Sequence, residues 1–176
     1  GEVSQCDEYD ILGASGNGGN AEYVAVNTDK MMRMPAGFDF VKAAAAPLAY
    51  QTAWRALVRR ARLVEGEDVL VLGASGGVAA ACIQISKLLG ARIFAVTSSE
   101  EKMDKARRSG ADFALNRKAS NPFDEVRRLT DGRGVDLVVE NTGAATWADS
   151  QNILRKGGRL VTYGRTTGRE AITNIS

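Results

Sequence analysis

The stretch 68–90 reads DVLVLGASGGVAAACIQISKLLG, and the interpretation of the whole chain starts from it. It opens with an unbroken apolar run, which is typical of a strand buried on both faces of a parallel sheet. Small residues follow at once, and an apolar-periodic helical segment then runs to Gly90, a typical helix-ending glycine. The order strand, glycine turn and helix predicts a phosphate site, because backbone N–H groups and the helix N-terminus favour a bound pyrophosphate.

The glycine pattern differs from the usual G-x-G-x-x-G spacing. It reads G-x-x-G-x-x-A over Gly73, Gly76 and Ala79, with Gly77 as an additional glycine. The alanine at the last position still allows close packing of helix on strand. Taken alone, the pattern also fits a tight turn in some other α/β fold, so the choice depends on the rest of the chain.

Length and composition restrict the class of protein. The chain has 176 residues, of which 44% are hydrophobic and 25% charged, as in a globular protein with one core. A net charge of +2 gives no electrostatic case for nucleic acid or membrane as a partner, and no apolar run approaches the roughly 20 residues of a membrane span. No signal peptide is visible and the 2 cysteines form no disulfide framework, so we expect a cytoplasmic protein.

Histidine is absent, which removes the commonest general base and the commonest metal ligand. No residue has a convincing role in proton transfer: Tyr50 is conceivable, but a core or interface tyrosine is the simpler interpretation. The chain also begins without Met and in the middle of a pattern, which we interpret as a piece of a longer protein.

From residue 68 onward, strands and helices alternate, which predicts an α/β fold with a doubly wound parallel sheet. Strands are expected at 69–72, 92–97, 112–116, 135–140 and 159–163. Helices are expected between Gly77 and Gly90 and at 100–109, 123–130 and 147–154, with Gly157 and Gly158 closing the last one.

The part of the chain before this alternation is read as two further segments. Residues 1–36 resemble the tail of another domain, with a loop at 13–20 and strands at 21–26 and 30–34 whose sheet partners lie elsewhere. Residues 37–64 are read as a connecting helix, with Asp39 as its N-cap candidate and Pro47 breaking or kinking it. The predicted domains are therefore 1–36, 37–64 and 65–176.

Ligands of a doubly wound sheet bind where the carboxyl ends of its strands meet. In this chain small, polar or cationic residues gather at those ends, over 73–78, 97–99, 116–117, 141–143 and 163–166. This concentration is a second indication of a nucleotide site.

The end of the second strand bears on the identity of the nucleotide. NAD-binding domains usually place an acid there, which accepts from the ribose 2′-hydroxyl. Ser98 and Ser99 stand there instead, followed by Lys102, and the acids come only at the start of the next helix. Hydroxyls and a lysine favour a 2′-phosphate, and Arg117 can add a second cation, so the residues predict NADP(H), with NAD(H) possible. The alternative is that Lys102 and Arg117 merely face solvent.

Five stretches occur in a recognisable order: GGNAEYVAV at 18–26, AAAAPLAYQTAWRAL at 43–57, GEDVLVLGASGGVAAACIQISKLLGA at 66–91, GRGVDLVVENTG at 132–143 and GGRLVTYG at 157–164. Together they resemble the medium-chain dehydrogenases/reductases, the superfamily of zinc alcohol dehydrogenases and quinone oxidoreductases. The resemblance covers essentially the whole chain. It implies a three-layer αβα Rossmann domain that lacks its last strand, preceded by a short β remnant of the GroES-like catalytic domain.

The resemblance also implies roles for individual residues. The pyrophosphate loop of the quinone-oxidoreductase-like variant is matched by Gly73, Ser75, Gly76, Gly77 and Val78. Lys102 matches a lysine on the 2′-phosphate of NADPH-dependent members, Arg117 falls where some of them carry a tyrosine, and Thr52 matches a threonine near the nicotinamide. The positions that line the adenosine and nicotinamide ends are matched by Asn141, Thr142, Gly143, Tyr163, Gly164 and Thr166.

The departures from the family pattern concern zinc. Zinc-dependent members carry a cysteine ligand four residues before that threonine, where this chain has Leu48. Cys6 resembles the last of four cysteines of the structural zinc lobe, and one cysteine cannot close a tetrahedral site. Zinc is therefore not expected in this chain, and no metal ligand is assigned.

The leading interpretation is the NADP(H)-binding domain of an oxidoreductase that transfers a hydride between nicotinamide and an alcohol or carbonyl, or a quinone or enone. This piece alone is expected to be inactive, and the intact enzyme to act on a small molecule as a homodimer or higher homo-oligomer. Two alternatives stay open: a dinucleotide-binding module without catalysis and, less favoured, an S-adenosylmethionine-dependent methyltransferase. The latter usually places an acid where Ser98 and Ser99 stand.

Overall fold

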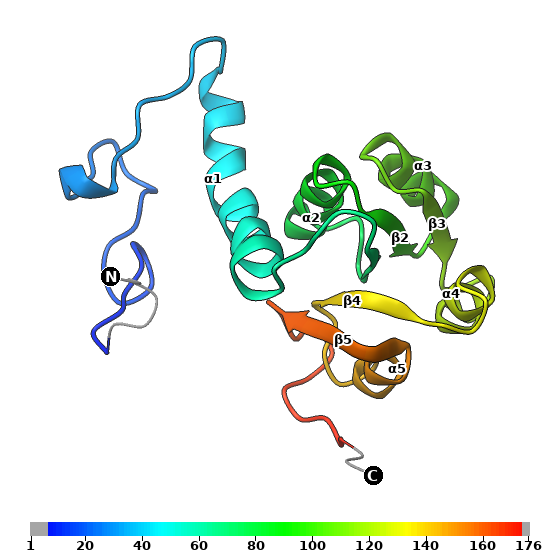
Figure 1. Cartoon of the computed structure of the whole chain (residues 1–176). Helices are drawn as coiled ribbons and strands as arrows, with labels where there is room; N and C mark the ends of the chain where they lie inside the picture. The colour runs from blue at the N-terminus through cyan, green and yellow to red at the C-terminus, as the bar shows by residue number, and fades with distance from the viewer. Residues whose placement is uncertain (1–6, 174–176) are drawn as a thin grey trace. The chain divides into compact units, whose positions relative to one another are not determined.

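A parallel sheet forms the centre of the larger of two compact units. The computed structural model describes residues 7–173, and the chain divides into the units Gly1–Asp39 and Phe40–Ser176. The five strands lie in the order β3-β2-β1-β4-β5, and every neighbouring pair is parallel (Figure 1). Their bounds are β1 Asp68–Val71, β2 Arg92–Thr97, β3 Phe113–Asn116, β4 Val135–Glu140 and β5 Leu154–Thr162.

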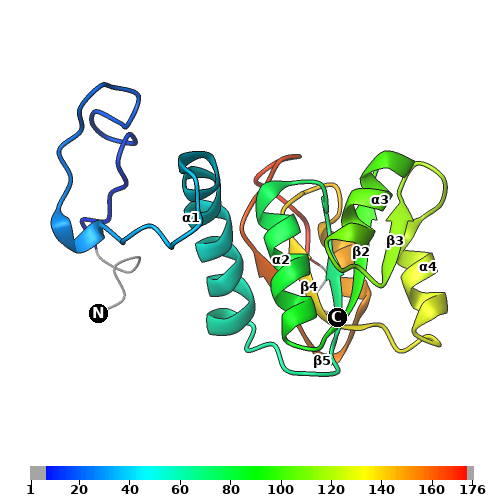
Figure 2. The same cartoon turned by 90° about the horizontal axis from the view of Figure 1, so that it is seen from above.

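Helices cover both faces of this sheet, as Figures 1 and 2 show. Their bounds are α1 Phe40–Trp54, α2 Gly77–Leu88, α3 Glu100–Arg108, α4 Pro122–Leu129 and α5 Trp147–Asn152. Alternate residues of β1 enter two different cores, because successive side chains of a strand point to opposite faces. Val69 and Val71 pack in the core that contains Ile83 of α2, whereas Leu70 packs in the core that contains Val126 of α4. The predicted α/β fold with three layers and a parallel sheet is therefore present.

The main difference from the expected strands concerns β5. It begins at Leu154 rather than at residue 159, and its register with β4 is interrupted: Val135 pairs with Leu154, but Leu137 pairs with Arg159. Gly157 and Gly158 lie inside this irregular stretch instead of closing α5, which ends at Asn152. Gly157 has φ +76, a backbone conformation that glycine adopts without a steric cost, and this permits the bulge.

The sequence predicted that Pro47 would break or kink the helix, and the structure shows no break there. Helix α1 begins directly after Asp39 and runs through Pro47 to Trp54, and the π-helical segment η3 (Arg55–Arg60) continues it. An interior proline removes one backbone donor and crowds the carbonyl four residues earlier, and packing can hold the helix together despite this cost. Here the fully buried Ala53 and Leu57 pack into the core beside α2. Among the described helices, none has the length and apolar character that a bilayer crossing requires.

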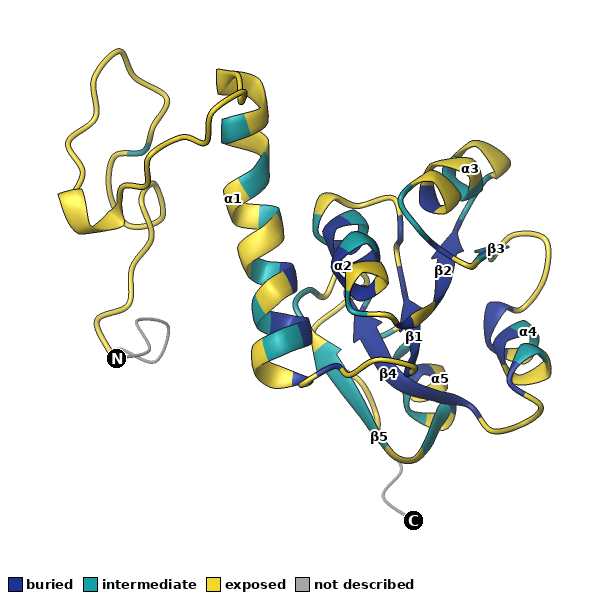
Figure 3. Ribbon diagram, turned by 45° about the horizontal axis from the view of Figure 1, so that its top comes forward, coloured by how far each residue is buried: buried dark blue, intermediate teal, exposed yellow. Residues whose placement is uncertain are grey.

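The smaller unit does not contain the expected strands at 21–26 and 30–34. Its one described helical turn is η2 (Thr28–Lys30), where the Asn27 side chain accepts from the backbone N–H of Asp29 at 2.9 Å. A strand persists only where a neighbouring strand pairs with its N–H and C=O groups, and residues 7–39 provide no such partner. The unit is accordingly exposed almost throughout, with Tyr23 91% exposed (Figure 3).

Candidate functional site at the carboxyl ends of the strands

A cavity of about 720 Å³ lies at the carboxyl ends of β1, β2 and β4. Its volume is in the range of small-molecule sites. The predicted site residues that line it are Gly73, Ser75, Gly76, Ser98, Lys102, Arg117, Asn141, Thr142 and Thr166. Thr97, which the sequence places at the end of β2 together with Ser98, lines it as well. Lining residues that the sequence did not single out for the site are Leu72, Val96, Asn121, Pro122, Phe123, Ala145, Thr146, Asp149 and Thr167. The strands, helices and loops that contain these residues were expected from the sequence. Only the tertiary contacts bring their side chains to one cavity.

The glycine turn after β1 is anchored to its neighbours on two sides. The N–H of Ala74 donates to the carbonyl of Val96 at 2.9 Å, and the N–H of Gly76 donates to the carbonyl of Gly73 at 3.0 Å. Gly73 has φ +58, and a Cβ atom there would lie 2.7 Å from Oδ1 of Asn141. Any larger residue at this position would therefore displace Asn141, which itself lines the cavity.

The N-terminus of α2 opens beside this turn without a side chain to cap it. Gly76 is the N-cap, and no side chain accepts a hydrogen bond from the first turn. The first N–H groups of a helix have no partner inside the helix, so those of Gly77 and Val78 remain available to a ligand. A Cβ atom at Gly77 would meet only the Ala49 side chain, at 4.0 Å. This arrangement suits an anionic group such as a phosphate.

The end of β2 places a small cluster of donors at the same cavity. Nζ of Lys102 lies 3.3 Å from Oγ of Ser98, and both residues line the cavity together with Arg117. Ser99 does not line it: its side chain caps α3 by accepting from the backbone N–H of Lys102 at 3.4 Å. Neither Lys102 nor Arg117 forms an ion pair with an acid among residues 7–173. Both cations are therefore available to an external anion.

The acids that follow β2 are directed elsewhere. Glu100 accepts from the Asn116 side chain at 3.4 Å, and Glu101 pairs with Lys105 at 2.7 Å. Asp149 of α5 is the one acid among the described residues that line the cavity. The lining thus has an excess of positive charge.

Two loops that follow β4 and β5 are joined by hydrogen bonds into one wall of the cavity. The N–H of Thr166 donates to the Asn141 carbonyl at 3.3 Å, and that of Thr167 donates to the Thr142 carbonyl at 2.7 Å. The hydroxyl of Thr167 accepts from the N–H of Ala145 at 3.0 Å. These hydrogen bonds tie the two loops together along one side of the cavity.

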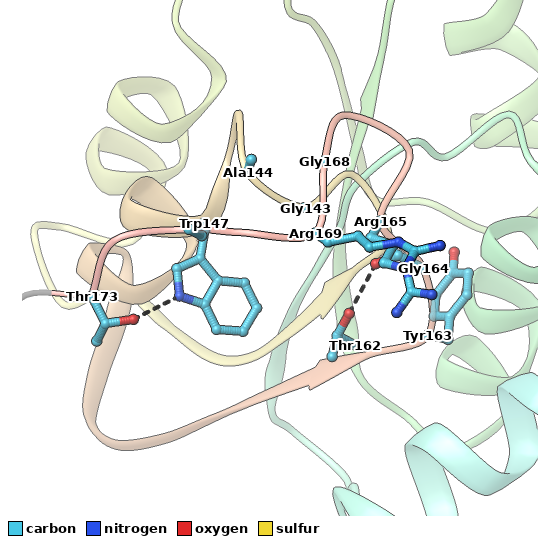
Figure 4. A pocket seen from close by; sticks show the side chains of 11 residues that line it. Gly143, Ala144, Trp147, Thr162, Tyr163, Gly164, Arg165, Gly168, Arg169 and Thr173 are labelled. Carbon is cyan, nitrogen blue, oxygen red and sulfur yellow. Dashed lines mark hydrogen bonds between the residues drawn. The ribbon is translucent and has the colours of Figure 1, made fainter.

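Three predicted residues, Gly143, Tyr163 and Gly164, line a second cavity of about 710 Å³ instead (Figure 4). Trp147 closes part of this cavity, and its indole N–H donates to the Thr173 hydroxyl at 3.0 Å. Burial raises the pKa of Tyr163, whose hydroxyl lies near the Asn141 amide but makes no hydrogen bond of regular geometry.

Thr52 lies at neither of these cavities. It lines a third one of about 340 Å³ that it shares with Tyr163, and its hydroxyl donates to the Leu48 carbonyl at 2.9 Å. Gly77, Val78 and Ser99 do not line the first cavity: Gly77 and Val78 begin α2 directly after the lining residue Gly76, and Ser99 is the N-cap of α3. The predicted residues are thus spread over neighbouring sites, and only part of the set meets in one cavity.

The described residues do not fit a zinc ion. No group of three or more His, Cys, Asp or Glu side chains within residues 7–173 is arranged to hold a metal. Leu48 is 75% exposed on α1 and has no ligand atom, and Cys6 lies outside the described residues. Cys82 is completely buried, and burial raises the pKa of its thiol to about 12, so it is a packing residue.

The fold and the site define a Rossmann-type domain: a parallel sheet with a glycine turn, an uncapped helix and a cavity at the strand ends. Residues 77–176 match the family described as zinc-binding dehydrogenase. An NAD-dependent alcohol dehydrogenase of Sulfurisphaera tokodaii is 36% identical over 93% of this chain and 48% of its own length. The human quinone oxidoreductase is 32% identical over 84% of this chain and 45% of its own length.

Solved structures agree with these relatives. A crystal structure of an NAD-dependent alcohol dehydrogenase superposes with a TM-score of 0.89 at 40% identity, over 94% of this chain and 48% of that one. The Escherichia coli quinone oxidoreductase in complex with NADPH superposes with a TM-score of 0.75 at 29% identity, over 84% of this chain and 45% of that one. The chain belongs to the zinc-binding dehydrogenase family of the medium-chain dehydrogenase/reductase superfamily and corresponds to its cofactor-binding domain. It spans about half the length of the curated relatives it matches.

Proposed function

We propose that this chain binds NADP(H) and serves an oxidoreductase that transfers a hydride between the nicotinamide and an alcohol or carbonyl, or a quinone or enone. The observation that carries the proposal is the cluster of Ser98, Lys102 and Arg117 at a cavity whose nearest strand-end acids are engaged elsewhere. A 2′-phosphate carries negative charge and several acceptor oxygens, which match two cations and a hydroxyl.

The residues present fit such a nucleotide. The uncapped N-terminus of α2 beside Gly76 would hold the pyrophosphate, since its N–H groups have no side-chain partner. Lys102 and Arg117 would hold the 2′-phosphate, and Asn141 and Thr166 would line the remaining path of the nucleotide along the wall. The nicotinamide would supply the hydride, and the protein's contribution is binding, orientation and the exclusion of water.

The larger assembly is part of the same proposal. Residues 1–36 would belong to a GroES-like catalytic domain that this chain contains only in part, and the intact protein would form a homodimer or a higher homo-oligomer. These points rest on the family membership and on the share of each relative that the chain covers.

The test is a calorimetric titration of the purified protein with NADPH and, separately, with NADH. Tighter binding of NADPH is expected, because only NADPH can use Lys102 and Arg117. Tighter binding of NADH would overturn the choice of cofactor and would agree with the name of the Sulfurisphaera tokodaii relative. Binding of neither nucleotide, with S-adenosylmethionine bound instead, would overturn the oxidoreductase proposal.

A further inference from the structure

Glu140 is a buried acid that the proposed nucleotide site has not used so far. It is the last residue of β4 and is 0% exposed. A buried carboxylate is costly unless donors satisfy it. None of its hydrogen-bond partners is a cation; all of them come from the segment that directly follows the strand.

The two carboxylate oxygens divide these partners between them. Oε1 accepts from the backbone N–H of Thr142 at 2.5 Å and of Gly143 at 3.1 Å. Oε2 accepts from the hydroxyl of Thr146 at 2.8 Å and of Ser150 at 2.6 Å. One oxygen therefore holds the turn after β4, and the other holds the start and the body of α5.

The segment that Glu140 holds in this way forms the wall between two cavities. Asn141, Thr142 and Thr146 line the first cavity, whereas Gly143 lines the second. The Thr142 carbonyl also accepts from both the N–H and the hydroxyl of Thr167, each at 2.7 Å, so the loop after β5 depends on the same turn. Glu140 itself does not line either cavity.

We infer that Glu140 is a positioning residue of the nucleotide site. Its carboxylate keeps the turn after β4 in the conformation that the nucleotide contacts, without touching the nucleotide. The inference rests on the proposed function. Because none of its four hydrogen bonds involves Ser98, Lys102 or Arg117, loss of Glu140 weakens NADPH and NADH equally.

The test compares three variants by nucleotide titration, thermal unfolding and amide hydrogen exchange. Glu140→Asp shortens the side chain by one methylene, so that its oxygens cannot reach both sets of donors. Its affinity should fall about tenfold for both nucleotides, as expected when buried backbone donors lose their acceptor. The amide protons of Thr142 and Gly143 should exchange faster than in the parent protein.

The other two variants separate positioning from stability. Glu140→Gln keeps an oxygen for the two backbone donors, and its amide N–H groups can donate to the hydroxyls of Thr146 and Ser150, so affinity should stay within about threefold of the parent. Val138→Ala is the matched control: Val138 lies on the same strand, points to the same face and is 0% exposed. It should lower the unfolding temperature and leave both affinities and the two amide exchange rates unchanged.

Different results would contradict the proposed NADP(H) binding and the positioning role of Glu140. If the parent protein binds neither nucleotide, the proposed function fails. If the parent binds NADPH but Glu140→Asp stays within about twofold for both nucleotides, or changes their ratio, the positioning role is wrong. If Glu140→Asp does not fold, Ser150→Ala removes one donor from Oε2 away from the cavity and should weaken both nucleotides about twofold to threefold; no change would overturn the inference.

Discussion

The two ends of the parallel sheet use charge in opposite ways. At the amino end, Asp68 accepts from Arg92 at 2.5 and 2.7 Å and from Arg133 at 2.6 Å. Asp136 accepts from Arg133 at 2.8 Å, from Arg155 and from the backbone N–H of Asp68. Both carboxylates are nearly fully buried, with side chains 4% and 6% exposed. This end is closed by charges that satisfy one another.

The carboxyl end leaves its cations without acids. Lys102 and Arg117 line the cavity, and no ion pair among residues 7–173 engages either of them. Removing one partner of a buried charge pair destabilises a fold, whereas a cation without an acid beside it can attract an anionic ligand. From this comparison we expect stability and the proposed nucleotide binding to be separated along the strand axis, so that each end can be altered without the other.

The largest expected effect is a loss of folding stability when an acid at the amino end of the sheet is removed. Asp136→Ala removes the acceptor of the Arg155 Nε–H and of the Asp68 backbone N–H, and leaves Arg133 with Asp68 as its remaining carboxylate partner. Losing these charge-assisted hydrogen bonds should cost about 3 kcal/mol. Urea unfolding measures the loss, and NADPH affinity of the folded protein should not change.

Its control is Asp104→Ala, which removes an exposed ion pair with Arg107 and should cost about 0–1 kcal/mol. A loss of nucleotide affinity in Asp136→Ala under conditions where the variant is folded would show that the two ends are coupled.

Lowering the pH should also destabilise the folded protein through the amino end of the sheet, and this loss should be gradual. Burial alone would raise the pKa of Asp136, but hydrogen bonds from Arg133, from the Asp68 backbone and from Arg155 outweigh it and hold that pKa well below its usual range. The stabilisation is therefore present above the ordinary pKa of 3.8 and is lost as pH falls below it, because the unfolded chain takes up the proton first.

Urea unfolding between pH 7 and pH 3 measures this loss. The free energy of unfolding should decrease most steeply below about pH 4, and Asp136→Asn should reduce that slope. An unchanged slope in the variant would mean that other carboxylates carry the acid sensitivity.

The smallest expected effect is on NADPH affinity, when a cation at the carboxyl end of the sheet is removed. Lys102→Ala should weaken NADPH binding by about 1–3 kcal/mol, the range for a lost charge-assisted hydrogen bond, and should leave NADH binding and the free energy of unfolding nearly unchanged. Titration calorimetry with each nucleotide provides the measurement.

Lys105→Ala is the control for this prediction, since Lys105 lies on the same helix, pairs with Glu101 and does not line the cavity. Equal losses for NADPH and NADH in Lys102→Ala would remove Lys102 from the 2′-phosphate site.

Local patterns predicted most of the sheet. Strands β2 and β4 begin and end where expected, and the turn after β1 has the glycine that its backbone needs at Gly73. The predictions failed where a distant contact decided the outcome. Packing of Ala53 and Leu57 holds the helix that contains Pro47, and the missing partners of residues 21–26 leave that segment without a sheet.

The site was predictable only in part for the same reason. Ser98, Lys102 and Arg117 could be named because strand ends on one edge of a parallel sheet must lie close together. Thr52 and Tyr163 were named as well, but the structure places them at neighbouring cavities. Glu140 was read only as the end of a strand, although an acid after an apolar run is a signal that a buried polar group needs partners.

The amino-acid sequence by itself determined the order of elements, the glycine turn and the cations at the strand ends. These depend on side-chain periodicity and turn chemistry within a few neighbouring residues. Only the tertiary structure decided which charges are satisfied. Asp68 and Arg133 are 65 residues apart in the chain, and their contact exists because β1 and β4 pair in one register. Hydrogen bonds and ion pairs of this kind depend on distances in space, which a local pattern does not contain.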